Sequence, residues 1–396
     1  MLLALDQAHP SEMLQILHNQ LSSGFGAIET RLLVADYDQT ELRRLDDLPV
    51  EHLERLQIDG TDAGASFREQ RPIEAPTGSA GDSETVYLPV SMRGERLGVL
   101  VVRMRVRPDR PTLDALQAVA TTVSYVLYSA ARYTDAFERA RRHRQLSLPA
   151  EMQWALLPAR AFRCPEFTVA GQLVPAYEVG GDVFDYAIES DKLTVSVIDA
   201  MGHALEASVM AGLALASLRN RRRAGEGISE QLAATDRRLY DYRGGDHFVT
   251  ALQVEIDVKT GRGRVASAGH PPARRLRDGE VTSLSTVPNL PLGLTGDTDY
   301  DVTPIELRDG DRLLLLSDGV IESRSTEGEE FGDRLLDRVL VDTAKLPAGE
   351  ATIRLQEAVR AHSHPLDLRD DATLVLLDWR GSHELGFVDR GAREPD

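Results

Sequence analysis

The chain has 396 residues, which at roughly 150 residues per domain suggests two to three domains. Hydrophobic residues make up 42% and charged residues 27% of the sequence, which is typical of a globular protein and excludes a disordered or fibrous one. The net charge of −18 argues against nucleic acid or an anionic lipid surface as a partner, because little positive charge is left over to neutralise phosphates. An excess of carboxylates can also hold divalent cations, although most of them simply keep the protein soluble.

The single cysteine, Cys164, excludes an internal disulfide framework and a cysteine-rich zinc site. No run of about 18 apolar residues occurs, so no membrane-spanning helix is predicted. Asp6 comes too early in the chain for the apolar core of a secretion signal. We therefore expect a protein of the reducing cytoplasm.

Residues 1–110 are expected to form a mixed α/β domain. Residues 60–83 are rich in Gly, Pro, Ser and Asp and are predicted to form a loop. The strand-like stretches 86–90 and 97–102 flank the turn residues Arg93-Gly94-Glu95, which predicts a hairpin.

The apolar pattern changes to a heptad repeat after residue 111. Residues spaced alternately three and four apart are Leu116, Val119, Val123, Val126, Ala130, Tyr133, Phe137 and Ala140. Up to Val126 we expect this helix to pack within its own domain. Beyond Ala130 the flanking residues become strongly polar, which predicts a two-helix seam between the protomers of a parallel homodimer.

Strands alternate with helical blocks from Phe167 to Trp379. Strands are predicted over 194–198, 248–258, 312–316 and 372–377, helices over 205–223 and 349–363, and a hairpin turn at 278–279. Such a mixture of neighbouring strands and helices predicts an α+β sandwich.

Acidic residues lie at the ends of predicted strands or in turns at four positions. They are Asp182, Asp199, Asp318 and the pair Asp370-Asp371. A carboxylate at the end of an apolar strand lies at the edge of a low-dielectric core and must be paired, neutralised or bound to a metal. A neighbouring glycine lets a carbonyl or ligand come close. If these strand ends converge, their oxygen atoms suit Mg²⁺ or Mn²⁺ better than zinc, whereas any single Asp-Gly is explained by a turn.

Eight motifs follow one another in the second part of the chain. They occupy residues 152–158, 175–185, 199–203, 248–251, 268–272, 291–294, 318–322 and 370–373. In this order they resemble the metal-dependent PPM-type (PP2C-like) serine phosphatases of bacteria, of the RsbU/SpoIIE type that regulates sigma-factor partner switching. The resemblance implies a PPM-phosphatase-like antiparallel β-sandwich flanked by helices over residues 158–381, with two Mn²⁺ or Mg²⁺ ions between the sheet edges.

The resemblance also implies a site. It assigns Asp199 to both metal ions, Asp182 and the Ala200 carbonyl to one ion, and Asp318 with Asp370 or its neighbour Asp371 to the other. Asp185 is expected in a hairpin or beside the ligands and not among them.

Two ions that share a water and lower its pKa would supply the nucleophile for in-line attack on a phosphoserine or phosphothreonine. The catalytic roles then fall to Asp182, Asp199 and His203, the last as a candidate proton donor to the leaving oxygen. His270 is a second candidate donor. For both histidines, anchoring a glycine-rich turn is the simpler interpretation.

The N-terminal residues 1–110 resemble a GAF sensory domain, with a PAS-like module as the alternative. Residues 111–157 would be a coiled-coil-like linker, and residues 382–396 a polar tail. We expect the sensor to alter the helix pairing around residues 130–157 and so to position the metal ligands. The resemblance implies a phosphorylated STAS-type anti-anti-sigma protein, an antagonist of an anti-sigma factor, as the substrate.

A catalytically silent phosphatase fold that serves as a signalling scaffold is the alternative function. A diguanylate cyclase, suggested by residues 180–184, is rejected. Its chemistry requires an acid where Val183 stands, and it leaves Asp318 and Asp370 without a role.

Overall fold

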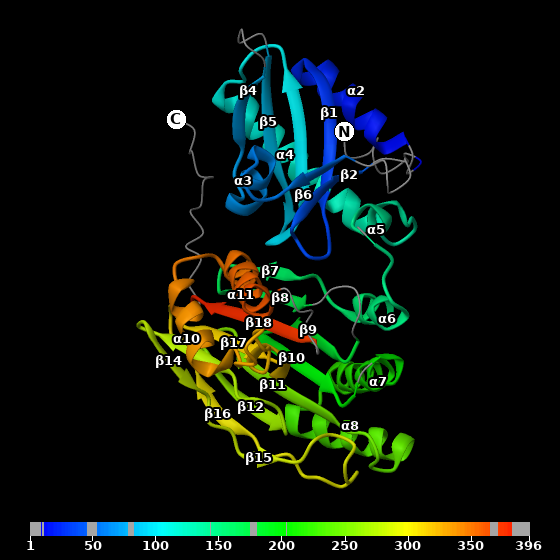
Figure 1. Ribbon diagram of the computed structural model, residues 1–396, viewed down its shortest axis with the longest axis vertical. Coiled ribbons are helices and arrows are strands. Elements are labelled where there is room, and N and C mark those ends of the chain that lie inside the picture. Colours follow the sequence, from blue (N-terminus) through cyan, green and yellow to red (C-terminus); the bar gives the residue numbers. More distant parts are fainter. Residues whose placement is uncertain are drawn as a thin grey trace, which may run out of the picture.

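Two parts, each built around its own β-structure, follow one another along the chain and lie end to end along its long axis (Figure 1). The computed structural model describes residues 9, 12–45, 54–77, 83–142, 144–174, 180–202, 204–364 and 371–381. We refer to residues 12–142 as the N-terminal part and to residues 144–381 as the C-terminal part. Within the described residues, no helix combines the length and the apolar character needed to cross a bilayer.

Six antiparallel strands form the sheet of the N-terminal part, in the order β3-β2-β1-β6-β5-β4. Their bounds are β1 (Ala27–Ala35), β2 (Glu41–Arg44), β3 (Arg55–Gln57), β4 (Ile73–Thr77), β5 (Ser83–Met92) and β6 (Glu95–Met104). The predicted hairpin is confirmed, because β5 and β6 meet at Arg93 and Gly94, which both have positive φ.

The predicted loop over residues 60–83 is wrong, since this stretch contains helix α3 (Asp62–Glu69) and strand β4. The Thr61 side chain accepts a hydrogen bond from the Gly64 N–H and begins the helix. A side chain at Gly64 would overlap with the Ile58 backbone, so this glycine serves close packing and not a turn.

Helices α2 (Met13–Phe25) and α4 (Arg110–Ala130) cover one face of this sheet, and α3 covers the other. The heptad residues of α4, among them Leu116 and Val123, are buried against the sheet, as expected for the first half of the repeat.

The predicted helical seam beyond Ala130 is wrong, whereas the parallel homodimer itself stays a prediction. The helix ends there, and in the short α5 (Ala136–Ala140) Phe137 and Ala140 are buried in the same core of the N-terminal part. A heptad pattern can equally serve a helix that lies on its own sheet, and only Tyr133 of this second half is well exposed.

The C-terminal part contains two sheets. Sheet 1 has the order β15-β12-β11-β10-β9 with β16 also paired to β12, and sheet 2 has the order β14-β13-β17-β18-β8-β7. The strands of sheet 1 are β9 (Asp182–Glu189), β10 (Lys192–Ala200), β11 (Val249–Asp257), β12 (Arg262–Ala268), β15 (Pro288–Asn289) and β16 (Thr303–Glu306). Those of sheet 2 are β7 (Ala161–Arg163), β8 (Phe167–Val174), β13 (Arg274–Arg277), β14 (Glu280–Ser283), β17 (Arg312–Leu316) and β18 (Ala372–Trp379).

The sheets face each other across an apolar core that includes Val195, Val254 and Leu315. The helices of this part are α6 (Leu148–Leu156), α7 (Ala204–Arg223), α8 (Ile228–Arg243), α9 (Asp318–Ile321), α10 (Gly332–Asp342) and α11 (Ala348–Ser363). Helices α7 and α8 pack on the outer face of sheet 1, and α10 and α11 on that of sheet 2 (Figure 1). The predicted antiparallel sandwich flanked by helices is therefore confirmed for this part.

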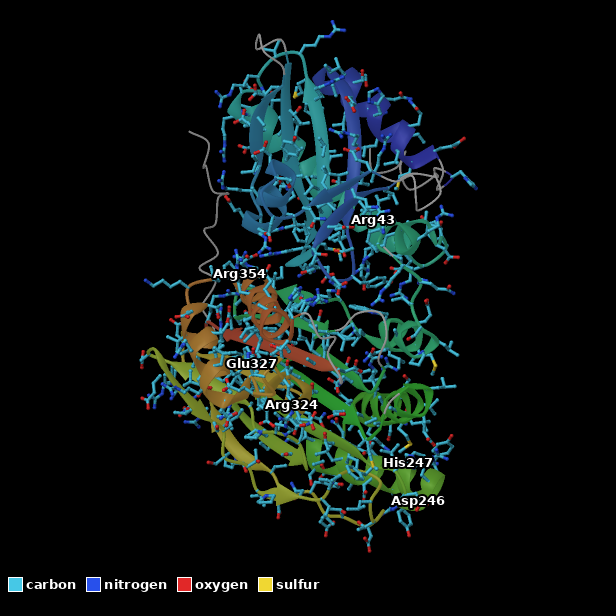
Figure 2. All side chains as sticks on the ribbon, in the orientation of Figure 1. Arg43, Asp246, His247, Arg324, Glu327 and Arg354 are labelled. Carbon is cyan, nitrogen blue, oxygen red and sulfur yellow. The ribbon has the colours of Figure 1, made fainter. Side chains whose placement is uncertain are left out.

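Ion pairs join the N-terminal part to helix α11. The carboxylate of Glu350, whose side chain is 10% exposed, contacts Arg68 at 3.0 Å and Arg96 at 2.8 Å, and both arginines belong to the N-terminal part. Arg354 on the same helix contacts Glu350 at 3.3 Å and lies at the boundary between the two parts (Figure 2). Arg360 of α11 pairs in the same way with Asp38.

A second contact joins the N-terminal part to α6 and β7. The rings of Tyr37 and Trp154 have centroids 4.5 Å apart, and Arg160 donates to the Tyr37 carbonyl at 2.8 Å. The Glu95 carboxylate accepts the Ala161 N–H at 2.7 Å. Burial raises the pKa of Glu95, while the positive charge of Arg160 opposes that shift.

Replacing Glu350 by alanine should lower the free energy of unfolding by about 3 kcal/mol, because Arg96 would remain buried without its charge partner. Urea-induced unfolding of the full chain measures this change. Glu306→Ala is the matched control, since Glu306 is exposed and pairs with Arg262 only at 3.7 Å, so its loss should cost less than ~1 kcal/mol. Equal destabilisation by both variants would contradict this account of the interface.

Candidate metal centre

Two acidic residues lie side by side at one edge of sheet 1. Asp182 is the first residue of β9, Asp199 is the penultimate residue of β10, and the two are direct partners in the antiparallel register. Side chains of directly opposed residues project from the same face of a sheet with their Cβ atoms about 5 Å apart. The sequence order of strand, turn and strand therefore brings these two carboxylates together.

Sheet 2 brings two further acidic residues to the matching edge. Asp318 follows β17, Asp371 precedes β18, and these strands are antiparallel neighbours. The Ser317 N–H donates to the Thr373 carbonyl at 3.1 Å, and the Thr373 N–H donates to Ser317 Oγ at 2.9 Å. A side chain at Gly319 would overlap with the Asp371 carbonyl, so the glycine after Asp318 permits this close approach.

The carboxylate of Asp371 ties the two sheet edges together. Its Oδ2 accepts the Gly181 N–H at 2.7 Å and the Asp182 N–H at 3.1 Å. The Gln153 side chain of α6 donates to the same oxygen at 3.0 Å and also to the Asp182 carbonyl. Asp371 is therefore already engaged by three donors that fix the start of β9.

The glycines before Asp182 are required by packing. A side chain at Gly180 would overlap with Ser208 of α7 and Pro149 of α6. At Gly181 a Cβ would stand 3.1 Å from the Ala200 carbonyl oxygen, and the Gly181 carbonyl accepts the Ala200 N–H at 3.1 Å. Gly181 thus lies directly against the end of β10 that carries Asp199.

Asp182 is in an unfavourable environment for a negative charge. It is 2% exposed, and burial together with the charges of Asp199 and Asp371 raises its pKa well above the ordinary value. Its Oδ2 is buried and has no hydrogen-bond partner among the described residues. A divalent cation bound to Asp182 would offset the repulsion among the carboxylates and would give Oδ2 a partner. Mg²⁺ and Mn²⁺ prefer hard oxygen ligands of this kind.

The structure describes only some of the residues predicted to hold the metal ions or to act in catalysis. Asp199 and Asp318 are half-buried and Ala200 is buried. The predicted site residues His203 and Asp370 lie outside the described residues. Among the residues that are described, no three His, Cys, Asp or Glu side chains form a metal-holding group by themselves.

His270 has a structural role that joins the two sheets. The imidazole is 6% exposed, and its Nδ1 contacts Thr250 Oγ1 at 2.7 Å while Nε2 contacts the Leu316 carbonyl at 3.0 Å. Because a carbonyl only accepts, Nε2 carries the proton and Nδ1 accepts from the Thr250 hydroxyl. Thr250 is the β11 partner of Asp199, so His270 holds the two ligand-bearing edges in register.

Asp185 lies within β9 and not in a hairpin turn, which corrects one part of its predicted placement. Its carboxylate pairs with Arg219 at 2.8 Å and with Arg222 at 2.9 Å, both from α7. These two ion pairs fasten α7 to sheet 1. Gln153 was recognised only as part of a motif. A buried amide among the apolar residues of α6 is the signal that could have marked it.

Residues 189–380 match the family model described as Stage II sporulation protein E (SpoIIE). The chain is 24% identical over 208 residues to "Phosphoserine phosphatase RsbP" of Bacillus subtilis (strain 168), an alignment that covers 51% of this chain and 49% of RsbP. It is 22% identical over 234 residues to "Phosphoserine phosphatase RsbU" of the same organism, covering 59% of this chain and 69% of RsbU. The chain thus spans about half the length of RsbP.

The SiaA-PP2C domain of Pseudomonas aeruginosa superposes with a TM-score of 0.50 and 23% identity, covering 59% of this chain and 94% of that domain. This similarity shows that the C-terminal part has a PP2C-type fold. The GAF-like assignment of the N-terminal part stays a prediction.

The stability of the protein should depend on pH through His270. Burial lowers the pKa of His270 from 6.5 to about 4, so between these values the unfolded chain binds more protons than the folded one. The contribution of His270 to the free energy of unfolding should therefore rise by about 3 kcal/mol in total as the pH increases from 4 to 6.5. Above pH 6.5 this contribution should stay constant. Comparing urea unfolding of the wild type and His270→Gln across this range isolates the effect. Parallel pH profiles would contradict it.

Proposed function

We propose that the protein is a metal-dependent protein serine/threonine phosphatase that hydrolyses phosphoserine and phosphothreonine. The observation that carries this proposal is the buried carboxylate of Asp182, which stands against Asp199 and Asp371 with one oxygen unpartnered. Further support comes from the match of residues 189–380 to the SpoIIE model and from the phosphoserine phosphatases RsbP and RsbU among the relatives. A phosphorylated STAS-type anti-anti-sigma protein is the substrate we propose.

Two Mn²⁺ or Mg²⁺ ions, when bound, would supply an activated water and neutralise charge on the phosphoryl group. Asp199 would touch both ions, with Asp182 and the Ala200 carbonyl at one and Asp318 and Asp370 at the other. Asp371 already has a structural role, because three donors engage its Oδ2. We therefore assign Asp370 to the metal and give Asp371 the role of positioning Asp182.

The leaving serine oxygen needs a proton, and His203 is the residue we propose to donate it. His270 is unsuited to this role, since burial lowers its pKa to about 4 and both ring nitrogens are engaged within the core. A neutral imidazole that is closed off from solvent cannot return protons to the site at each turnover.

We further propose that the N-terminal part is a GAF-like sensor that acts on the site through α6. The Tyr37 ring of the N-terminal part packs against the Trp154 ring at an interplanar angle of 43°, and the adjacent residue Gln153 donates to Asp371 and Asp182. A shift of α6 relative to the N-terminal part would therefore change the hydrogen bonds that hold the start of β9. The single cysteine of the chain fits a reducing cytoplasm as the location of this activity.

Phosphate release from a phosphoserine peptide should require Mn²⁺ or Mg²⁺ and should fall at least ~100-fold in Asp199→Asn, because a neutral amide replaces a bridging carboxylate. A malachite-green assay with EDTA and metal add-back measures it. Asp278→Asn is the control, since Asp278 lies in a turn remote from the site and asparagine tolerates its positive φ. Metal-independent release would sink the proposal, and no release at all would favour the silent scaffold.

Replacing Trp154 by alanine should change the rate of peptide hydrolysis at saturating Mn²⁺ at least ~3-fold, because it removes an aromatic ring contact worth about 1 kcal/mol between α6 and the N-terminal part. Tyr242→Ala, which truncates an aromatic side chain that is 54% exposed, is the control. Circular dichroism checks that both variants are folded. An unchanged rate in Trp154→Ala would remove the proposed route through α6.

A further inference from the structure

We propose that a cleft between the two parts of the chain binds a small anion that carries two or more phosphate groups. This arginine cleft has a volume of about 780 Å³ and is lined by Arg68 and Arg96 of the N-terminal part, Arg163, Arg312, Lys345 and Arg380 of the C-terminal part, and the start of α11. A volume in this range is usual for a small-molecule site. The inference goes beyond the proposed phosphatase function and does not depend on it.

The arginine cleft is distinct from the candidate metal centre. It borders Arg312 at the start of β17 and Trp379 at the end of β18, whereas the acidic residues lie at the opposite ends of these strands. The eight residues of β18 separate the two places by about 25 Å at ~3.3 Å per residue. A ligand in the cleft would therefore not occupy the metal centre.

Positive charge is concentrated in the cleft against the trend of the whole chain. The sequence has 63 acidic and 45 basic residues, yet the basic side chains lining the cleft outnumber the acidic ones. The lining acids are Glu69, Asp278, Asp311 and Asp378, and three of them are neutralised by ion pairs with Arg71, Arg277 and Arg312 respectively. Since Arg68, Arg96 and Arg312 are themselves paired with acidic residues, the unpaired charges of the lining among the described residues are three cations against Asp278 alone.

Three of the lining cations have no acidic partner within the described residues. Arg163 and Lys345 are exposed and make no ion pair there. Arg380 donates only to neutral oxygens, namely the carbonyls of Cys164 and Pro165 and the hydroxyl of Thr168, at 2.8 to 3.0 Å. These side chains can turn to a ligand without breaking a salt bridge of the fold.

A buried guanidinium adds a preformed donor group. The Arg96 side chain is only 6% exposed, and its Nη1 pairs with Glu350, while its Nε and Nη2 have no hydrogen-bond partner among the described residues. Gly349 also lines the cleft, and a Cβ there would stand 3.6 Å from Arg96 Nε. The missing side chain leaves room for a ligand atom beside the guanidinium.

The first turn of α11 contributes backbone donors at the same place. Ala348 and Gly349 line the cleft, and no side chain caps this helix. Uncapped N–H groups at the start of a 16-residue helix favour an anion. Together with forked guanidinium groups and an ammonium, they form the donor set that phosphate oxygens satisfy best.

The distribution of donors decides the class of ligand. They come from both walls of a cleft that spans two parts of the chain, so a single carboxylate could reach only some of them. The one lining tryptophan, Trp379, is 2% exposed and stacked on Phe167, which leaves no ring surface for a base. The phosphate groups themselves are therefore what the arginine cleft recognises.

Isothermal titration calorimetry of the full chain with inorganic pyrophosphate in EDTA tests the proposal without contribution from a metal site. We expect one pyrophosphate per chain, and binding at least ten times weaker in the double variant Arg163→Glu/Lys345→Glu. Arg237→Glu/Arg238→Glu is the matched control, because these exposed arginines of α8 lie outside the cleft and the change in net charge is the same. The control should bind as the wild type does.

Failure of the wild type to bind pyrophosphate would overturn the proposed site. Equal weakening of binding in the two double variants would also overturn it, because the effect would then come only from the change in net charge. Parallel titrations with inorganic phosphate and ATP separate the classes of ligand, and binding of phosphate as tight as that of pyrophosphate would refute the requirement for two phosphate groups. Peptide hydrolysis with Mn²⁺ should persist in Arg163→Glu/Lys345→Glu, so failure of the cleft and failure of the phosphatase proposal can be told apart.

Discussion

The hydrogen bonds that Asp371 accepts from Gly181 and Asp182 are the constraint on which the candidate site depends. They close the gap between the edges of two sheets that are far apart in the sequence. They also force Asp182 into a buried position beside two other carboxylates, where its charge is unfavourable. A folded protein can keep a carboxylate in such a position when a bound cation offsets the free-energy cost of its burial. The packing of the two sheets is in this way linked to cation binding at their edges.

The fold was predictable where a local pattern decided it. The apolar run of β17, the hairpin at Asp278-Gly279 and the helix α7 could all be predicted, since each depends on neighbouring residues. Helices α8 and α10 were not predicted, because their charged residues obscure the apolar spacing. Beyond Ala130 the heptad repeat predicts a seam between protomers, yet Phe137 and Ala140 are buried in the core of their own chain. Sequence spacing alone does not distinguish a neighbouring helix from the chain's own sheet.

The candidate site was predictable in part for the same reason. The pairing of Asp182 with Asp199 follows from consecutive strands, and the glycines beside Asp182 and Asp318 suggest close approach. The roles of Asp371 and Gln153 depend on how two sheets and a helix meet, which no local pattern encodes.

The N-terminal part contacts the C-terminal part at α6 and again at α11, and the arginine cleft opens beside the second contact. The chain thus offers two separate places at which a signal could act.

The central claim is that carboxylates from separate strands bind divalent cations. Calorimetric titration of the metal-free full chain with Mn²⁺ tests it most directly. The account predicts saturable binding by the wild type and weakened binding in Asp182→Asn, with Asp278→Asn behaving as the wild type. Absence of Mn²⁺ uptake by the folded wild-type protein would contradict it.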